Sequence, residues 1–211
     1  MNHFNLFNKK ETKETKKDVK KNEEFSFTSE SEHDTKDNVI YINGEISDSF
    51  FELTKKLKEI VSKQSKLREW KIVIYINSPW GDLIETFNFL SIIDHAKQLG
   101  IKIITVVTSL IASAASVIAI QGDERYVSKF AAHLIHFPRW VSYQENPDQL
   151  ENNNKMWKFY NETLVSTYKR FTKLRDPEKK MTQDNYTIRG ADELIKQWFA
   201  DFRLEDSQEV L

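Results

Sequence analysis

Apolar residues along the chain fall into short continuous runs, separated by longer segments in which they recur every three or four positions. The runs at 39–42, 71–77 and 101–108 predict buried strands, because a parallel strand covered on both faces is apolar almost throughout. The segments at 47–69 and 82–99 predict helices with one apolar face. This alternation predicts a mostly parallel sheet joined by right-handed crossovers.

The second half of the chain continues the alternation and adds a long helix. Small residues predict a helix at 109–119, and two short strands are expected at 125–127 and 133–137. A polar helix with apolar side chains along one side is expected at 147–175, and a last helix at 191–198. The predicted order, β-α-β-α-β-α-β-β-α-α, is that of an α/β fold.

The N-terminal segment differs from the rest in composition. Its first 36 residues hold eight Lys and eight acidic residues but few large apolar ones, so they cannot bury enough surface to offset the entropy of ordering. We therefore expect a disordered, charged tail at 1–37 and one folded domain at 38–211. Alternatively, Phe4, Leu6 and Phe7 form a docking patch that orders on a partner.

Charge and cysteine content exclude several classes of function. The 31 Lys and Arg balance 32 Asp and Glu, so the chain has no overall attraction to nucleic acid or anionic membranes. The absence of Cys excludes disulfides, thiol nucleophiles and Cys-based zinc sites, and we expect a cytoplasmic protein. The uncharged run at 103–122 could cross a bilayer by length, but its β-branched first half and small-residue second half favour a buried strand followed by a buried helix.

Chemistry is expected where strands end and helices begin, because reactive groups of parallel sheets gather at that edge. Two such junctions lie at 77–82 and 108–114. At the second, serines open a helix close to unpaired backbone N–H groups, which can stabilise the oxyanion formed when a serine attacks a carbonyl. Small-residue helices also occur simply because they pack tightly, so this spacing alone leaves a structural role open.

A serine nucleophile needs a base, and the chain has five histidines. His3 and His33 lie in the expected tail, and His95 lies on a polar stretch of helix. His133 and His136 remain, three residues apart on an extended segment, so their side chains are expected on opposite faces. His136 lies where its strand gives way to a loop, which fits either a base or a histidine that is merely hydrogen-bonded.

Four sequence blocks resemble those of one known family. Residues 75–81 resemble a strand ending in Asn-Ser-Pro-Gly-Gly, 110–119 a nucleophile block, 134–138 a catalytic-histidine block, and 193–201 a closing helix and exit strand. In this order they resemble the proteolytic subunit of the Clp protease family, particularly its phage-type branch with a shorter loop. The resemblance implies stacked β-β-α units of the Clp protease and crotonase-like fold, with a mostly parallel sheet and a protruding handle helix.

The resemblance also implies roles for individual residues. Ser113, nine residues before Gly122, corresponds to the nucleophile, and His136, 23 residues after Ser113, corresponds to the general base. Ser116 and His133 fall on positions that are not catalytic in the family. The implied chemistry uses no metal or cofactor.

The remaining implied site residues are a carboxylate and two backbone donors. Asp184 corresponds to the acid that orients the histidine, because an aromatic residue follows it two positions on, as in the family. Two extra residues before the final helix leave Asp176 and Asp192 as alternatives. The oxyanion hole would use the backbone N–H groups of Gly81 and Ala114.

The chain departs from the family pattern at three positions. Trp80 replaces the first glycine of the Gly-Gly pair, Ser109 replaces the glycine before the nucleophile, and Ile111 replaces a small residue. Trp80 and Ile111 are bulky where substrate backbone is expected. They could narrow the cleft or mark a subunit with an impaired site.

The resemblance implies partners as well. Family members form heptameric rings that stack in pairs through the handle helix, here expected at about 147–175, with active sites inside a chamber. A ring ATPase of the AAA+ unfoldase class would supply unfolded polypeptides as substrates. The helix at 147–175 could instead pack on its own sheet.

Three functions remain open on the sequence alone. The first is a self-compartmentalised serine endopeptidase, and the second is a non-cleaving ring subunit with the same fold. The third is a crotonase-type acyl-CoA enzyme, which shares the paired N–H oxyanion hole but needs acid–base carboxylates and a CoA pocket. A Ser–His pair favours the first two.

Overall fold

The structure is a computed structural model that describes residues 34–47, 50–64, 70–139, 147–182 and 186–207. Its elements, in chain order, are β1 (Asp34–Lys36), β2 (Val39–Asn43), α1 (Phe50–Gln64), β3 (Lys71–Asn77), α2 (Leu83–Gln98), β4 (Lys102–Val107), β5 (Leu110–Ala112), α3 (Ala114–Ala119), β6 (Glu124–Val127), β7 (Ala132–Ile135), α4 (Pro147–Phe171), α5 (Pro177–Thr182), β8 (Tyr186–Arg189), α6 (Ala191–Lys196), β9 (Phe202–Arg203) and a 3-10 turn (Leu204–Asp206). This order confirms the mixed α/β fold with a mostly parallel sheet.

The larger sheet has six strands in the order β1-β2-β3-β4-β6-β9. Its neighbours are parallel except β1 and β2, which form an antiparallel hairpin through a turn at Asp37, where φ is 54°. β1 lies inside the range predicted for the tail. The sequence did not indicate this strand, because DTK has no apolar residue. Residues 1–33, which include the possible docking patch, lie outside the described residues.

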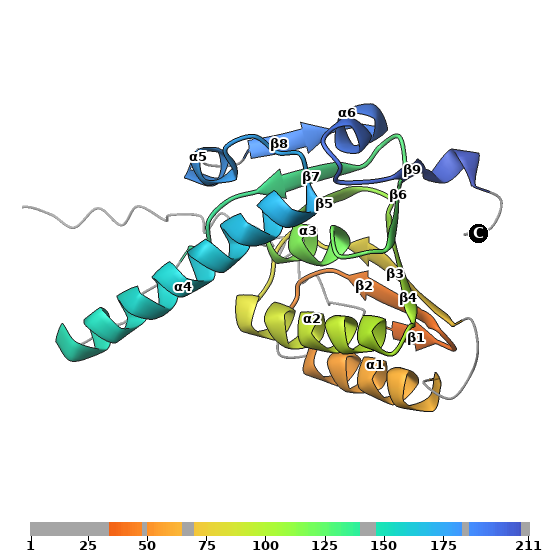
Figure 1. The fold of residues 1–211 in the computed structure, drawn as a ribbon, viewed down its shortest axis with the longest axis horizontal. Coiled ribbons are helices and arrows are strands. Elements are labelled where there is room, and N and C mark those ends of the chain that lie inside the picture. Colours follow the sequence, from red (N-terminus) through yellow and green to blue (C-terminus); the bar gives the residue numbers. More distant parts are fainter. Residues whose placement is uncertain (1–33, 48–49, 65–69, 140–146, 183–185, 208–211) are drawn as a thin grey trace, which may run out of the picture.

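Helices α1 and α2 pack beside each other on one face of this sheet (Figure 1). Phe50, Leu53 and Leu57 of α1 are buried against Phe89 and Ile93 of α2, which explains the helical spacing of apolar residues in both segments. The other face of the sheet carries a smaller apolar cluster. Its buried members are Val73, Ile104, Val106 and Leu204.

A second sheet, formed by β5, β7 and β8, lies on the other side of α3 (Figure 1). The prediction of a helix over 109–119 is wrong in its first part, because Leu110–Ala112 is a strand and the helix begins only at Ala114. β5 pairs in parallel with β7, and β7 pairs antiparallel with β8, a strand that the apolar pattern did not indicate. Ser113 separates β5 from α3 with a φ of 55°.

The long helix α4 extends beyond the body of the molecule (Figure 1). It was predicted at 147–175 but ends at Phe171, because Lys173 N–H donates to Gln197 O (2.8 Å) and leaves the helical path. Pro177 opens α5 at the first helical position, where its missing N–H costs nothing. Leu164 and Tyr168, near the C-terminal end of α4, are buried in the main core.

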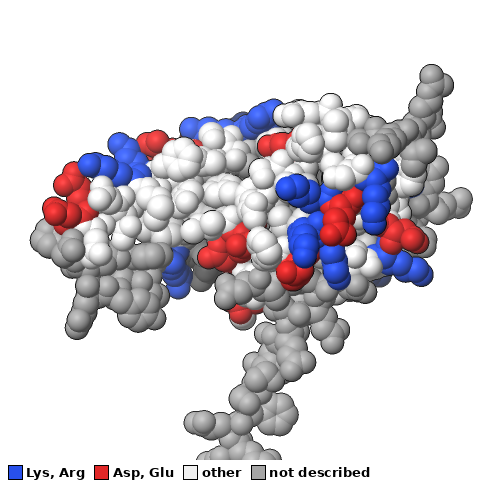
Figure 2. All heavy atoms as spheres, turned by 90° about the horizontal axis from the view of Figure 1, so that it is seen from below, with Lys and Arg blue, Asp and Glu red and all other residues white. Residues whose placement is uncertain are grey.

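The uncharged run at 103–122 folds as part of β4, as β5 and as α3, and most of its residues are buried, although Leu110 at the start of β5 is exposed. Within the described ranges no helix combines the length and apolarity needed to span a membrane. Acidic and basic side chains lie next to one another on the face in Figure 2. Ion pairs such as Lys97 with Asp123 (2.9 Å) and Lys102 with Glu124 (2.5 Å) reflect the same balance of charge.

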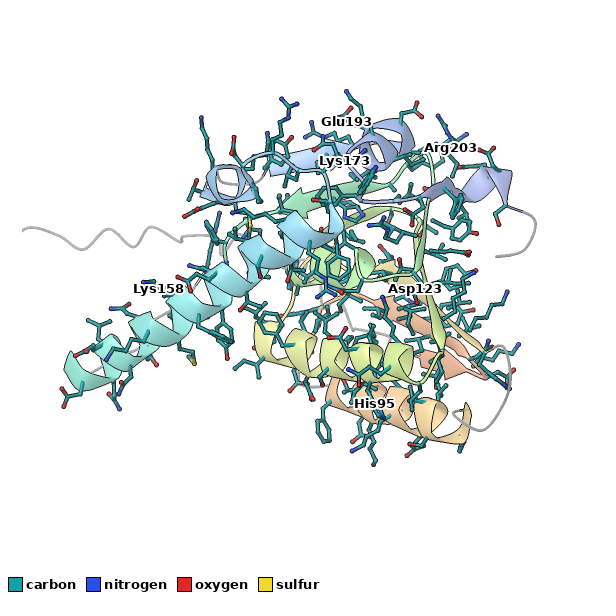
Figure 3. The ribbon with its side chains drawn as sticks, viewed as in Figure 1. His95, Asp123, Lys158, Lys173, Glu193 and Arg203 are labelled. Carbon is teal, nitrogen blue, oxygen red and sulfur yellow. The ribbon has the colours of Figure 1, made fainter. Side chains whose placement is uncertain are left out.

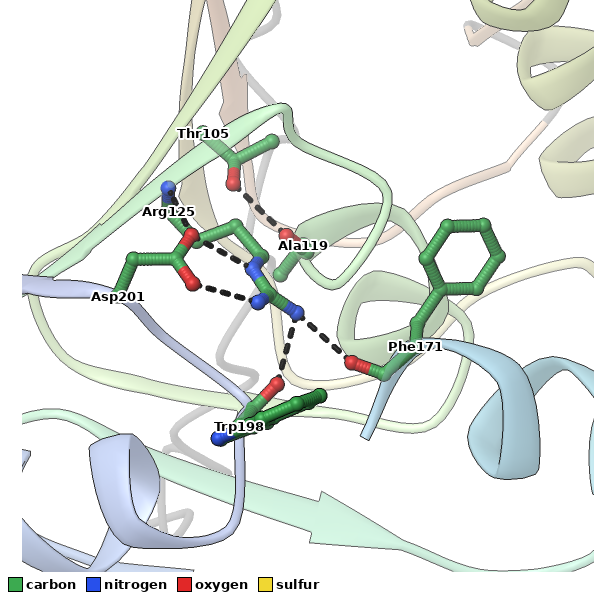
Figure 4. A network of polar contacts seen from close by, with 6 residues as sticks. All are labelled: Thr105, Ala119, Arg125, Phe171, Trp198 and Asp201. Atoms are coloured by element: carbon green, nitrogen blue, oxygen red, sulfur yellow. Dashed lines mark hydrogen bonds and ion pairs between the residues drawn. The ribbon is translucent and has the colours of Figure 1, made fainter. Parts of the chain in front are cut away.

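Arg125 on β6 is the centre of the polar network in Figure 4. Its Nε and Nη2 atoms donate to the two carboxylate oxygens of Asp201 (2.9 and 2.6 Å). Nη1 donates to the carbonyls of Phe171 (2.9 Å) and Trp198 (2.7 Å). Lys173, labelled in Figure 3, lies with its Nζ 3.8 Å from the ring centroid of Trp198. The network therefore joins the end of α4 to the segment between α6 and β9.

We predict that Asp201→Ala lowers the free energy of unfolding by about 2–3 kcal/mol, because it leaves a largely buried guanidinium without its carboxylate. The Arg125 side chain is only 12% exposed. Asp192→Ala is the matched control, since that carboxylate is 82% exposed and pairs with Arg203 at the surface, where an ion pair is worth about 1 kcal/mol or less. Urea denaturation measures both, and equal losses would contradict the assignment.

Candidate active site

The two strand-to-helix junctions predicted as reactive lie side by side. Ser109 Oγ donates to Asn77 Oδ1 (2.6 Å), and Ala112 N–H donates to Ser78 O (3.0 Å). These contacts link the end of β3 to β5 and to Ser109, the residue just before β5. The turn after β3 and the start of α3 therefore face a common space.

That space is a cavity of about 560 Å³. Four of the predicted site residues line it together: Ser113, His136, Gly81 and Ala114. The wall that α4 and α5 contribute is apolar or aromatic, and consists of Met156, Trp157, Tyr160, Leu164, Tyr168 and Met181. The cavity thus combines a hydroxyl, an imidazole and backbone donors with an apolar surface, as ligand sites usually do.

Ser113 has a strained backbone. Its φ of 55° and ψ of −121° match the first central residue of a type II′ turn, where glycine is usual. A serine in this region costs about 1–3 kcal/mol and is found mainly at functional sites. The turn ends β5, starts α3, and leaves the Ser113 side chain half-buried at the cavity.

Two backbone N–H groups remain available beside Ser113. Ile46 donates to Trp80 O (3.2 Å) and accepts from Asp82 N–H (2.6 Å), so the N–H of Gly81 between them points out of this parallel bridge. A Cβ at Gly81 would come within 2.2 Å of Ile46 Cβ, which only glycine avoids. Ala114 N–H belongs to the first turn of α3, and no described residue accepts from it or from Gly81 N–H.

His136 follows β7 directly, and its Nδ1 lies 2.6 Å from Phe137 O. Because a carbonyl can only accept, Nδ1 carries a proton, and in the neutral imidazole Nε2 then has the lone pair that a base requires. Phe137 N–H donates to Met181 O (3.2 Å), which holds this segment against α5. Among the described residues Ser113 and His136 share no direct hydrogen bond, an arrangement common before substrate binds.

The carboxylate that would orient His136 is not among the described contacts. Asp184 lies outside the described residues. Asp192 is exposed and pairs with Arg203, and Asp176 contributes its carbonyl to the first turn of α5 by accepting from Lys180 N–H (3.1 Å). Within the described ranges no group of three or more His, Asp or Glu side chains could hold a metal ion.

The two bulky departures from the family pattern lie in different places. Trp80 is 52% exposed and lines the cavity. The expectation that Ile111 narrows the cleft is not met, because Ile111 is fully buried in the main core. Successive side chains of a strand point to opposite faces, and in β5 the side chain of Ile111 points into the core. The helix expected at 109–119 did not predict this orientation.

A second Ser–His pair lies behind the first. Ser116 Oγ is 3.0 Å from His133 Nδ1, both residues are fully buried, and the side chain of Tyr168 lies close to Ser116. Burial, with Arg125 nearby, lowers the pKa of His133 to about 3, so the imidazole is neutral at physiological pH. The sequence holds one signal for this second pair. The two serines (Ser113 and Ser116) and the two histidines (His133 and His136) have the same spacing of three residues.

We predict that His133 makes the fold acid-sensitive. The unfolded chain binds a proton near pH 6.5 and the folded chain only near pH 3, so stability is complete above pH 6.5 and declines as the pH falls below it. The loss between pH 7 and pH 5 is about 2 kcal/mol. His133→Leu removes this component, and urea unfolding at both pH values measures the difference. Identical pH dependence in the two proteins would contradict it.

Comparison with known proteins agrees with this geometry. The family model described as Clp protease matches residues 20–194, which include both junctions, β7 and α4. A search of curated proteins found no match. The match covers most of the chain, and with it the resemblance inferred from four short blocks is confirmed at the level of the family. The chain belongs to the Clp protease family.

Proposed function

We propose that the chain is a serine endopeptidase subunit of the Clp type, with Ser113 as nucleophile and His136 as general base. The observation that carries this proposal is a single cavity in which a strained serine, a histidine with a free Nε2 and two unpaired backbone N–H groups meet. Family membership supports a peptidase. The match also favours peptide-bond hydrolysis over acyl-CoA chemistry.

In the proposed mechanism, Ser113 Oγ attacks the peptide carbonyl while His136 Nε2 accepts its proton. The N–H groups of Gly81 and Ala114 donate to the oxyanion of the tetrahedral intermediate. The imidazolium then gives its proton to the leaving amine, and an acyl-enzyme on Ser113 remains. Water, activated by His136, hydrolyses the ester and restores the serine.

The charge on the imidazolium needs a partner in this scheme. Phe137 O accepts from Nδ1 in the structure and already sets the tautomer. We propose Asp184 as the carboxylate that stabilises the charged form, by its position in the sequence. Asp192 is less suited, since its carboxylate is engaged by Arg203 at the surface.

A non-cleaving ring subunit is the second candidate. Trp80 favours it, because an indole stands at the cavity where the family pattern has glycine. The two candidates differ in one property: whether Ser113 reacts with an electrophile.

For either candidate we propose assembly into rings, with α4 as the handle between two rings. Phe159 on α4 is 62% exposed, and Leu150 is 49% exposed. Apolar side chains on a helix that extends beyond the body favour a covered position in an assembly. A chamber of heptameric rings, fed by an AAA+ unfoldase, would restrict substrates to unfolded polypeptides and peptides.

We predict that a fluorophosphonate probe labels Ser113 in the assembled protein, because a serine activated by His136 attacks phosphorus as it would a carbonyl. Ser113→Ala abolishes labelling and His136→Ala lowers its rate about 100-fold or more. Ser91→Ala is the control, since Ser91 is exposed on α2, bonded to Asn88 O, and outside the cavity. Mass spectrometry locates the label, and an unlabelled Ser113 would favour the non-cleaving subunit.

We predict that Phe159→Asp shifts the assembly to smaller particles, because it puts a charge on the face that we propose is covered. Analytical ultracentrifugation at micromolar concentration measures the change. Lys158→Asp is the matched control: Lys158 precedes Phe159 on α4, is 78% exposed and, within the described part of the chain, forms one long ion pair, with Glu162 (4.0 Å). Equal effects of the two variants would argue against packing through Phe159.

A further inference from the structure

The buried polar cluster formed by Ser116, His133 and Tyr168 has no role in the proposed mechanism. It joins α3, β7 and α4, and all three side chains are essentially excluded from solvent. His133 Nε2 has no hydrogen-bond partner among the residues that the structure describes, and its ring packs edge-on against that of Phe199, with centroids 5.2 Å apart. Burying polar atoms that are only partly satisfied costs stability. An apolar pair of similar volume would pack here without that cost.

The position of the cluster relates it to the cavity. Ser116 lies one helical turn after Ser113, and His133 lies three residues before His136 on the strand that leads to it. The start of α3 is already tied to β7 by one bond, from Ser113 N–H to Leu134 O (2.9 Å). That bond holds only the first residue of this segment on β7. The Ser116–His133 bond, one turn further along, gives α3 a second hydrogen bond to the same strand and so limits small rotations of the helix about the first.

We propose that the buried hydrogen bond between Ser116 and His133 is a positioning contact, which fixes the orientation of α3 on β7 and thereby the approach of Ser113 Oγ to His136 Nε2. The catalytic part of this inference rests on the proposed function. Tyr168 brings α4 to the same place, because it is buried close to Ser116 and also lines the cavity. The helix that follows Ser113 is therefore enclosed by β7 and α4 in the core.

Two substitutions at one position separate positioning from stability. His133→Asn keeps a polar atom close to the place of Nδ1 and can still pair with Ser116, whereas His133→Leu has a similar volume and cannot. Burial favours Leu over Asn, so a merely structural role predicts that the Leu variant is the more stable and the more reactive of the two. A positioning role predicts the opposite order of reactivity: the Asn variant is the more reactive, although the Leu variant is the more stable.

The experiment measures the rate of fluorophosphonate labelling at Ser113 in the assembled protein, beside urea unfolding of each variant. We expect His133→Asn to label within about threefold of the unsubstituted chain and His133→Leu to label about 10-fold to 100-fold more slowly, since misplacement by about 1 Å costs that much. A folded His133→Leu variant that labels as fast as the unsubstituted chain overturns the proposal. If His133→Leu does not fold, Ser116→Ala replaces it, with the same expected loss.

A second readout does not depend on catalysis. Hydrogen exchange at the Ser113 amide reports the bond to Leu134 O, and we expect its protection to fall in His133→Leu but not in His133→Asn. If the unsubstituted chain fails to label while the Ser113 amide responds in this way, the proposed function fails and the positioning contact stands. If the unsubstituted chain labels and neither readout separates the variants, the positioning contact fails and the proposed function stands.

Discussion

The candidate site depends on the parallel pairing of β5 with β7. The register places Ala112 opposite Leu134 and lets Ser113 N–H reach Leu134 O at 2.9 Å. The chain therefore brings Ser113, the residue after β5, close to the end of β7, where His136 follows. Because side chains alternate along a strand, a slip of one residue would turn His136 toward the core and His133 toward the cavity. A strand of three residues thus decides which serine and which histidine can meet.

The strain at Ser113 is offset by the burial that follows it. A φ of 55° costs about 1–3 kcal/mol for a serine, whereas all six residues of α3 are buried. Small side chains let α3 lie close to the sheets, and Thr105 Oγ1 donates to Ala119 O (2.7 Å) at its far end. The small residues therefore serve tight packing, and that packing in turn holds the serine in a conformation it would not adopt alone. A packing role and the proposed catalytic role of this segment are therefore compatible.

Much of the fold could be predicted because its strands and helices differ clearly in apolar spacing. β1 could not, since a strand reading DTK has no apolar side chain, and β5 could not, since its apolar residues run without a break into those of α3. For the site, the sequence indicated Ser113 and His136, because the family motif fixes them. It could not indicate that Phe137 O accepts from His136 Nδ1, which depends on a local side-chain rotamer. Nor did it indicate the role that we propose for His133, because the family pattern assigns no catalytic role to that position.

The departures from the family pattern affect access to the cavity more than its chemistry. Ile111 is buried in the core, so of the two bulky departures only Trp80 lines the cavity. The backbone of Trp80 is held, since its carbonyl accepts from Ser78 Oγ (3.0 Å) and from Ile46 N–H (3.2 Å), and the next residue, Gly81, has no room to shift toward Ile46. The loop that presents the Gly81 N–H therefore keeps its place whatever the indole does. A substitution at Trp80 would therefore change the wall of the cavity without moving the Gly81 N–H that we propose as an oxyanion donor.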